Sequence, residues 1–168
     1  MWQGRFITAV KDGRWEYVKR AGGIRAVVIL AETAAGEVLL VEQPRVPIGR
    51  HCLELPAGLI GDEDGGADDT VETAARRELE EETGYRAAGI EPLGEFYASP
   101  GMVSESFTLV RATGLEKVGE GGGTDGEEII VHRVPRHAIG HFVTAARERG
   151  IGIDVKLLML LGAEMLPG

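Results

Sequence analysis

The stretch RRELEEETGY, Arg76–Tyr85, places four glutamates in a short and strongly helical window. A helix turns by about 100° per residue, so Glu78, Glu81 and Glu82 fall on the same side as the apolar stripe that should face the core. The stripe consists of Val71, Ala74, Ala75 and Tyr85. Only Glu80 points clearly outward, as the glutamates of an ordinary solvated face would. The stretch therefore predicts three carboxylates on the inward face of an amphipathic helix.

Three inward carboxylates need a positive partner, because unpaired buried charges are costly and like charges repel. Arg77 is able to neutralise one of them. A divalent cation is the more economical partner for acids spaced i, i+3 and i+4. Oxygen ligands favour Mg²⁺ or Mn²⁺, and no His or Cys cluster indicates zinc. A structural ion-pair network is the alternative that the spacing leaves open.

Composition and charge restrict the class of protein. The chain has 168 residues, of which 43% are hydrophobic and 27% charged, as expected for one globular domain with a sizeable core. The net charge of -9 argues against general nucleic-acid binding, which needs a basic patch. We therefore expect a partner other than a nucleic acid.

Cysteine content and hydropathy bear on the compartment. Cys52 is the only cysteine, so an intrachain disulfide is excluded and a reducing compartment is favoured. The start, MWQGRFITAV, lacks the apolar core of a signal peptide. The longest apolar run, LLMLLGAEML, is too short to span a bilayer. We expect a cytoplasmic protein with no membrane partner.

The acidic helix has recognisable ends. Asp69 is a good N-cap, and Glu72 is its capping-box partner three residues later. The helix should run to Thr83 and stop at Gly84. The preceding loop, residues 61–69, is polar and rich in glycine, so we expect it to be exposed and mobile.

The remaining elements mix strands and helices. Polar and apolar residues alternate on both sides of Asp12-Gly13, which predicts a β-hairpin in residues 5–20. Further extended segments are expected at residues 24–32, 37–43, 53–60, 90–99, 105–113 and 129–135. Helices are expected at 137–150 and 154–166, and the tract GEGGGTDGEE, 119–128, reads as a flexible loop. Without regular strand–helix alternation, this order predicts an α+β fold or a sandwich on a mixed sheet.

The acidic helix also resembles the end of the Nudix box, Gly-x5-Glu-x7-Arg-Glu-U-x-Glu-Glu-x-Gly-U, where U is bulky and apolar. The matching positions hold Arg77, Glu78, Leu79, Glu81, Glu82, Gly84 and Tyr85. Asp69 stands where the family has Glu. The leading glycine is Gly58, and ten residues rather than five separate it from Asp69. The chain is thus similar to the family with a five-residue insertion and one Glu-to-Asp change.

Other segments resemble the ADP-ribose and ADP-sugar pyrophosphatases of this family. These are EQPRVPIGRHCLELPAGLI before the box, SPGMVSE after it, RWEYVKR near the N-terminus and IDVKLLMLLG near the end. The resemblance implies an α/β/α sandwich, with a hydrolase domain at 22–168 and an N-terminal β-hairpin segment at 1–21. Such hairpins commonly exchange between two subunits, so a homodimer is implied as well.

The resemblance also implies metal ligands and a catalytic base. The ligands to Mg²⁺, with Mn²⁺ as the alternative, would be Glu78, Glu81, Glu82 and the backbone carbonyl of Ala57. Glu82 is counted among the catalytic residues too. The base would be Glu127 on a late loop, with Glu128 and Asp125 as close rivals. The alternative for Glu127 is a solvated loop acid.

Substrate contacts follow from the same comparison. Arg20 and Arg45 are candidates for phosphate binding, because a planar guanidinium matches phosphate oxygens. Trp15 would stack on adenine, Glu16 would accept from its amino group, and Glu105 would contact the ribose end. Ordinary sheet packing is the alternative for Trp15.

The implied activity is Mg²⁺-dependent hydrolysis of the diphosphate bond of ADP-ribose, or of a related ADP-sugar, to AMP and a sugar phosphate. One alternative is a Nudix hydrolase acting on another nucleoside diphosphate derivative, such as NADH or an oxidised nucleotide. Another is a nucleotide-sensing module that binds without hydrolysis. A soluble domain with a structural acidic cluster is the third.

Overall fold

The computed structural model describes residues 2–22, 24–61, 69–124 and 126–165. Most of the predicted 61–69 loop and its insertion, residues 62–68, therefore lie outside the described residues. So does Asp125. In the described part of the chain, no helix combines the length and the apolar character needed to cross a membrane.

Helix α1, Val71–Thr83, is the predicted acidic helix. It ends as expected at Gly84, whose left-handed backbone lets its N–H donate to the Glu80 carbonyl. The predicted N-cap was wrong, because Thr70 caps the helix and its Oγ1 accepts from the Thr73 N–H at 3.1 Å. Asp69 accepts from the Gly61 N–H at 3.2 Å instead, so it ties the preceding loop to the helix.

Two four-stranded sheets form the body of the molecule. The first has the order β7-β4-β9-β8, and the second β10-β5-β6-β11. Their bounds are β4 Arg25–Ala31, β5 Glu37–Arg45, β6 Arg50–Glu54, β7 Ala57–Ile60, β8 Tyr85–Tyr97, β9 Ser106–Lys117, β10 Ile130–Pro135 and β11 Gly152–Ile153. The β4–β9 and β6–β11 pairs are parallel and the other pairs antiparallel, so both sheets are mixed.

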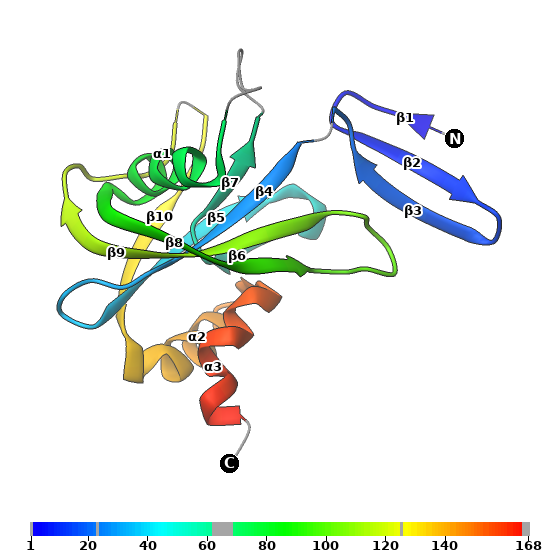
Figure 1. Cartoon of the computed structure of the whole chain (residues 1–168). Helices are drawn as coiled ribbons and strands as arrows, with labels where there is room; N and C mark the ends of the chain where they lie inside the picture. Colours follow the sequence, from blue (N-terminus) through cyan, green and yellow to red (C-terminus); the bar gives the residue numbers. More distant parts are fainter. Residues whose placement is uncertain (1, 23, 62–68, 125, 166–168) are drawn as a thin grey trace.

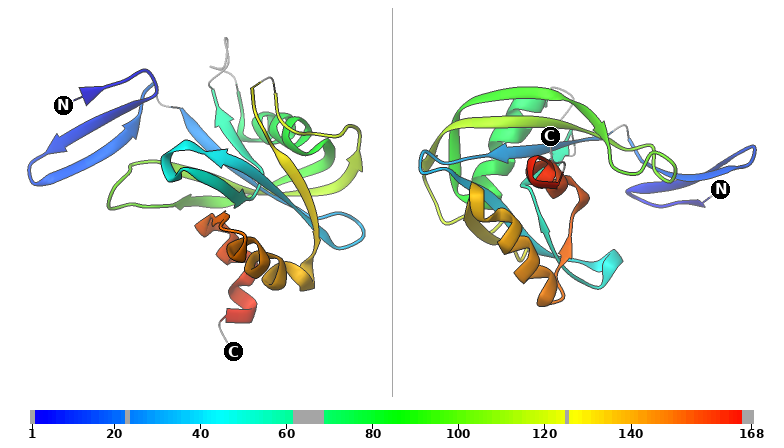
Figure 2. Two further views of the ribbon diagram at one scale, coloured as in Figure 1. Left: turned by 180° about the vertical axis from the view of Figure 1, so that it is seen from behind. Right: turned by 90° about the horizontal axis from the view of Figure 1, so that it is seen from below.

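Helices cover the sheets from opposite sides (Figures 1 and 2). Helix α1 lies on one side, whereas α2, Ile139–Glu148, and α3, Leu158–Met165, lie on the other. Each side has its own buried core: one includes Ile29, Leu39 and Leu79, and the other includes Leu53, Ile139 and Leu157. The predicted α+β fold is confirmed.

Short 3₁₀ helices lie between the longer elements of the described chain. They are η1 Val46–Ile48, η3 Arg136–Ala138 and η4 Val155–Leu157. The last helix was predicted to begin at residue 154. It begins instead as η4, because the Asp154 carboxylate accepts from the Lys156 N–H at 2.7 Å and caps that tight turn. Helix α3 follows directly.

A three-stranded sheet made by residues near the N-terminus projects from this body (Figure 1). Strands β2, Ile7–Asp12, and β3, Trp15–Arg20, form the predicted hairpin, and β1, Trp2–Gln3, is an additional strand. The Val18 N–H donates to the Met102 carbonyl at 2.9 Å, which attaches β3 to the loop after β8. The division of the chain at residues 21 and 22 stays a prediction.

Candidate functional site

A cavity of about 670 Å³ opens between the two sheets, beside α1 and η4. Its acidic lining residues are Glu54, Glu78, Glu82, Glu105, Glu127 and Asp154, and its basic ones are Arg20, Arg45 and Lys156. Six acids against three bases give a formal charge of -3. An anionic ligand would therefore need added positive charge to enter this cavity.

Glu82 is a buried acid whose pKa is raised by its surroundings. It is 5% exposed, and its Oε2 accepts from the Ala57 N–H at 3.0 Å. Burial is the main cause that raises the pKa of Glu82 to about 8; the hydrogen bond from Ala57 acts against this rise, and the charges of Glu78 and Glu127 contribute to it. Without a cation beside it, Glu82 therefore keeps a proton near neutral pH.

Glu78 is positioned by two neighbours, Arg77 and Gly58. Its Oε1 lies 3.2 Å from the Arg77 Nη1, and Arg77 also donates to the Leu59 carbonyl at 3.1 Å. A Cβ at Gly58 would lie 1.9 Å from the Glu78 Cδ, so only glycine leaves room for this carboxylate. Gly58 and Arg77 together direct Glu78 toward the cavity.

The predicted ligand set is only partly assembled. Glu78, Glu82 and Ala57 line the same cavity, whereas Glu81 is half-buried on α1 and is not one of its lining residues. Within the described ranges, no three His, Cys, Asp or Glu side chains stand close enough together to hold a metal ion as they are. The assignment of Glu81 as a ligand stays a prediction.

The glycine-rich tract after β9 is attached to the C-terminal end of α1. The Gly122 N–H donates to the Glu82 carbonyl at 2.9 Å, and the Gly123 N–H donates to the Glu81 carbonyl at 3.0 Å. Gly121 has φ +70°, and a Cβ there would lie 2.4 Å from the Thr83 carbonyl carbon. Glycine is needed because the tract caps α1 by direct backbone contact.

This attachment sets the place of the proposed base. Glu127 lines the cavity, and its Oε2 accepts from the Thr124 N–H at 2.8 Å. Glu128 is exposed and does not line the cavity. Glu127 is therefore better placed than Glu128 to act as the predicted base. Asp125 lies outside the described residues.

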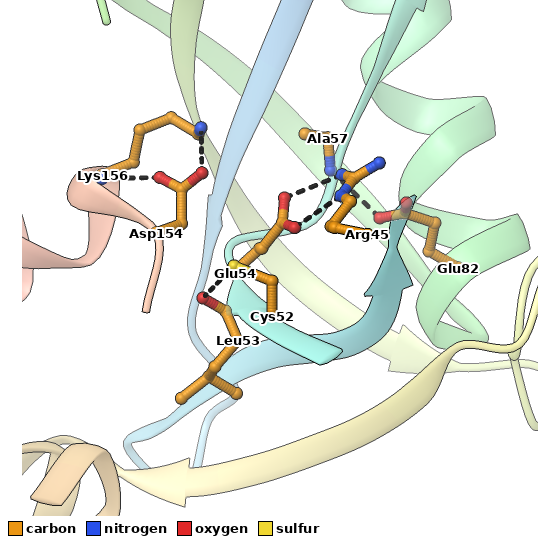
Figure 3. A network of polar contacts seen from close by, with 8 residues as sticks. All are labelled: Arg45, Cys52, Leu53, Glu54, Ala57, Glu82, Asp154 and Lys156. Carbon is orange, nitrogen blue, oxygen red and sulfur yellow. Dashed lines mark hydrogen bonds and ion pairs between the residues drawn. The ribbon is translucent and has the colours of Figure 1, made fainter. Parts of the chain in front are cut away.

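Arg45 reaches the cavity together with an acid that the sequence reasoning missed. Its Nε and Nη2 donate to the two carboxylate oxygens of Glu54 at 2.6 and 2.8 Å (Figure 3). Hydrogen bonding to Glu54 raises the pKa of Arg45 above its ordinary value. Glu54 is 4% exposed. An acid between Leu53 and Leu55 in a buried strand was the available signal, since such a group requires a partner.

A second pair, Asp154 and Lys156, has two members that were not predicted, and it lies farther from α1 (Figure 3). The Lys156 Nζ is 2.6 Å from the Asp154 Oδ2 and 5.7 Å from the centroid of the Phe107 ring. Nearby, burial raises the pKa of the Cys52 thiol to about 12, so this cysteine stays protonated. No local pattern in the sequence marks the Asp154–Lys156 pair, because its surroundings come from distant strands.

The N-terminal residues divide between two locations. Arg20 forms an ion pair with Glu105, and both line the cavity. Trp15 is 57% exposed at the tip of the projecting hairpin, and Glu16 there pairs with Lys11 at 3.2 Å. Neither Trp15 nor Glu16 lines the cavity of its own chain. The structure thus brings Arg20, Arg45 and Glu105 together and leaves the predicted adenine contacts outside.

The chain is similar to several known proteins. The family described as NUDIX domain matches residues 23–151. An ADP-ribose pyrophosphatase of Bacillus subtilis is 38% identical over 120 residues, which are 71% of this chain and 60% of that protein. A methanol dehydrogenase activator of Bacillus methanolicus is 38% identical over 115 residues, 68% of this chain and 58% of that protein. The chain therefore spans less than two thirds of the length of these relatives.

Two further similarities cover more of the chain. A GDP-mannose pyrophosphatase of Cronobacter sakazakii is 34% identical over 170 residues, 94% of this chain and 83% of that protein. The solved structure of an ADP compounds hydrolase matches 95% of this chain and 91% of its own, with a TM-score of 0.65 and 20% identity. At that identity the structural match shows a shared fold.

Proposed function

Because the chain belongs to the NUDIX domain family, we propose that it hydrolyses the diphosphate bond of ADP-ribose or a related ADP-sugar, releasing AMP and a sugar phosphate. One observation carries the proposal: a single acidic cavity is lined both by a buried glutamate, Glu82, and by cationic side chains suited to bind phosphate, Arg20 and Arg45. Nudix hydrolases generally use divalent metal ions.

The side chains at the α1 end fit a hard divalent cation. The available donors are oxygens, the local formal charge is negative, and the raised pKa of Glu82 means that a cation would displace its proton. Glu78, Glu81, Glu82 and the Ala57 carbonyl would hold Mg²⁺, with Mn²⁺ as the alternative. When bound, the ion supplies positive charge against the diphosphate and makes a water more acidic.

The chain's own groups supply the remaining chemistry. Glu127 accepts the proton of the water that attacks phosphorus, and the bond between phosphorus and the bridging oxygen breaks. Arg45 binds phosphoryl oxygens, and Glu54 holds its guanidinium in a fixed plane. Arg20, paired with Glu105, adds a second guanidinium on the hairpin side of the cavity.

The direct test is to incubate the purified protein with ADP-ribose, with and without Mg²⁺, and to follow AMP by chromatography. We expect AMP only with the metal. Release at the same rate without metal, or none under either condition, would contradict the proposal.

GDP-mannose is the second candidate substrate, because the relative of that activity matches most of this chain. A panel of ADP-ribose, ADP-glucose, GDP-mannose and NADH would rank kcat/KM. We expect the highest value for an ADP-sugar. A higher value for GDP-mannose would move the assignment to that substrate and leave the site chemistry unchanged.

The functional unit that we propose is a homodimer in which each hairpin tip completes the partner's site. Trp15 and Glu16 are exposed at the tip and absent from their own chain's cavity, which supports this arrangement. Mixing Trp15→Ala chains with Glu82→Gln chains should then restore activity, since one site of each mixed dimer contains both native groups. No recovery after subunit exchange would place Trp15 outside the partner's site.

We place the protein in the cytoplasm. Cys52 is buried and free, which fits a compartment where cysteines stay reduced.

A further inference from the structure

We propose that Lys156 is a phosphate-binding residue of the central cavity and that Asp154 is its positioning residue. Lys156 would contact phosphoryl oxygens of a nucleoside diphosphate sugar at the end of the cavity away from α1. The inference rests on the proposed function in taking such a compound as the ligand.

Lys156 is held inside the cavity. Its side chain is 16% exposed, its Nζ lies 2.6 Å from the Asp154 Oδ2, and it faces the ring of Phe107. A surface lysine normally extends its charged end into water. This one is fixed beside the cavity instead, so less side-chain entropy is lost when it meets a ligand.

Asp154 is already occupied by its own turn. Its Oδ1 accepts from the Lys156 N–H at 2.7 Å and its Oδ2 from the ammonium, while the Asp154 N–H donates to the Leu53 carbonyl at 3.0 Å. The last bond fixes the turn to the end of β6, next to Glu54. An ammonium has three N–H donors, and the bond to Asp154 uses one of them. Asp154 therefore orients Lys156 without using up its capacity to donate.

The distribution of charge identifies the ligand group. In Figure 3 Glu82 and Lys156 lie on opposite sides of the Arg45–Glu54 pair. A cation held at α1 would serve one end of a diphosphate, whereas both phosphoryl groups carry negative charge. Lys156 is the third of three cations in a cavity with six acids, and a lysine binds phosphate as a point charge. A phosphoryl oxygen at the far end is the group it fits.

The experiment measures binding by calorimetry in Mg²⁺, with two probes. One is the ADP-ribose analogue in which CH₂ replaces the bridging oxygen, and the other is inorganic pyrophosphate. Lys156→Met removes the charge with little change in shape. Lys156→Arg keeps the charge, and Lys117→Met is the matched control, since Lys117 pairs with Glu120 at 3.1 Å outside the cavity.

We expect Lys156→Met to weaken both probes by about 10- to 100-fold, the effect of losing one hydrogen bond to a charged group. Lys156→Arg should stay within a few-fold of wild type, and Lys117→Met should not change. Unaltered binding by Lys156→Met would overturn the inference. So would a loss confined to the ADP-ribose analogue, because the contact would then be with sugar or base.

Folding and activity are separated by two readouts. If Lys156→Met does not fold, as judged by thermal unfolding, Lys156→Arg decides alone: near-native binding of both probes supports the inference, and a folded variant with lost binding overturns it. Wild-type protein that binds both probes through Lys156 but releases no AMP from ADP-ribose would refute the proposed function and support the inference. Wild type that binds neither probe refutes both.

Discussion

The two ends of the central cavity are both built from charged side chains but differ in how those charges are compensated. At the α1 end, the buried Glu82 carboxylate meets a backbone N–H, and its pKa is raised to about 8. Away from α1, Arg45 in the middle of the cavity and Lys156 at its far end each have a carboxylate of their own within 3 Å, Glu54 and Asp154. The second end is complete as it stands, whereas the first favours an added cation.

The difference assigns separate tasks to the two ends. An end whose acid is uncompensated is suited to recruit a divalent ion and to carry the chemistry. An end whose cations are fixed by acids is suited to bind phosphate in one orientation. Substitutions at one end of the cavity should therefore have different kinetic effects from substitutions at the other.

The largest effect is expected for Glu82→Gln, which removes the charge at the α1 end. We expect kcat for ADP-ribose to fall by about 100-fold or more, because the proposed site would lose one of its cation ligands. Glu80→Gln is the control, because Glu80 belongs to the same helix but pairs with Arg86 at 2.7 Å outside the cavity. Equal rates for Glu82→Gln and wild type would refute the metal assignment.

Gly121→Ala tests the attachment that places Glu127 at the same end. The added Cβ would meet the backbone of Thr83 and displace the tract, so kcat should fall by about 10-fold or more with little change in KM. Gly150→Ala is the control, since Gly150 also has positive φ, +81°, but nothing within 4 Å. Similar kcat values in both variants would show that the tract does not position the base.

Arg45→Met tests the compensated end. It leaves the buried Glu54 carboxylate without its guanidinium, so we expect KM to rise and the free energy of unfolding to fall by about 2 kcal/mol. The double variant Arg45→Met/Glu54→Leu should recover much of that stability and none of the affinity. Chemical denaturation and steady-state kinetics measure the two effects. A double variant no more stable than the single one would contradict the account.

The last effect concerns stability and pH in metal-free buffer. The pKa of Glu82 is about 8 in the folded protein against an ordinary 4.5, so between these values the folded state holds a proton that the unfolded state releases. The stabilisation that protonated Glu82 gives the folded state is fully present below about pH 4.5 and is lost as the pH rises through 8. Thermal unfolding should thus show a steeper loss of stability with rising pH in wild type than in Glu82→Gln. Parallel curves would contradict the raised pKa.

The sequence predicted most of what local spacing controls. The inward direction of Glu82 followed from helical periodicity, and the stop at Gly84 followed from its left-handed conformation. Thr70 was missed as the cap because Asp69, the better capping residue in isolation, is used by Gly61. Local propensity cannot reveal such competition for a side chain.

The missed site residues depend on contacts between distant segments. The Asp154–Lys156 pair enters the cavity only because β11 pairs with β6, which brings the end of the chain beside Cys52 and Leu53. Similarly, Trp15 was placed correctly in a hairpin, but nothing local showed that the hairpin projects from the body and that Trp15 at its tip does not line the cavity. Those relations arise from tertiary topology.

The central claim is that Glu82 helps to hold a divalent cation at the α1 end. Binding of Mn²⁺, followed by electron paramagnetic resonance at pH 8.5 in wild type, Glu82→Gln and Glu80→Gln, tests it most directly. The account predicts that Glu82→Gln binds at least about 10-fold more weakly than wild type and that Glu80→Gln is unchanged. Equal Mn²⁺ affinity in all three proteins would contradict it.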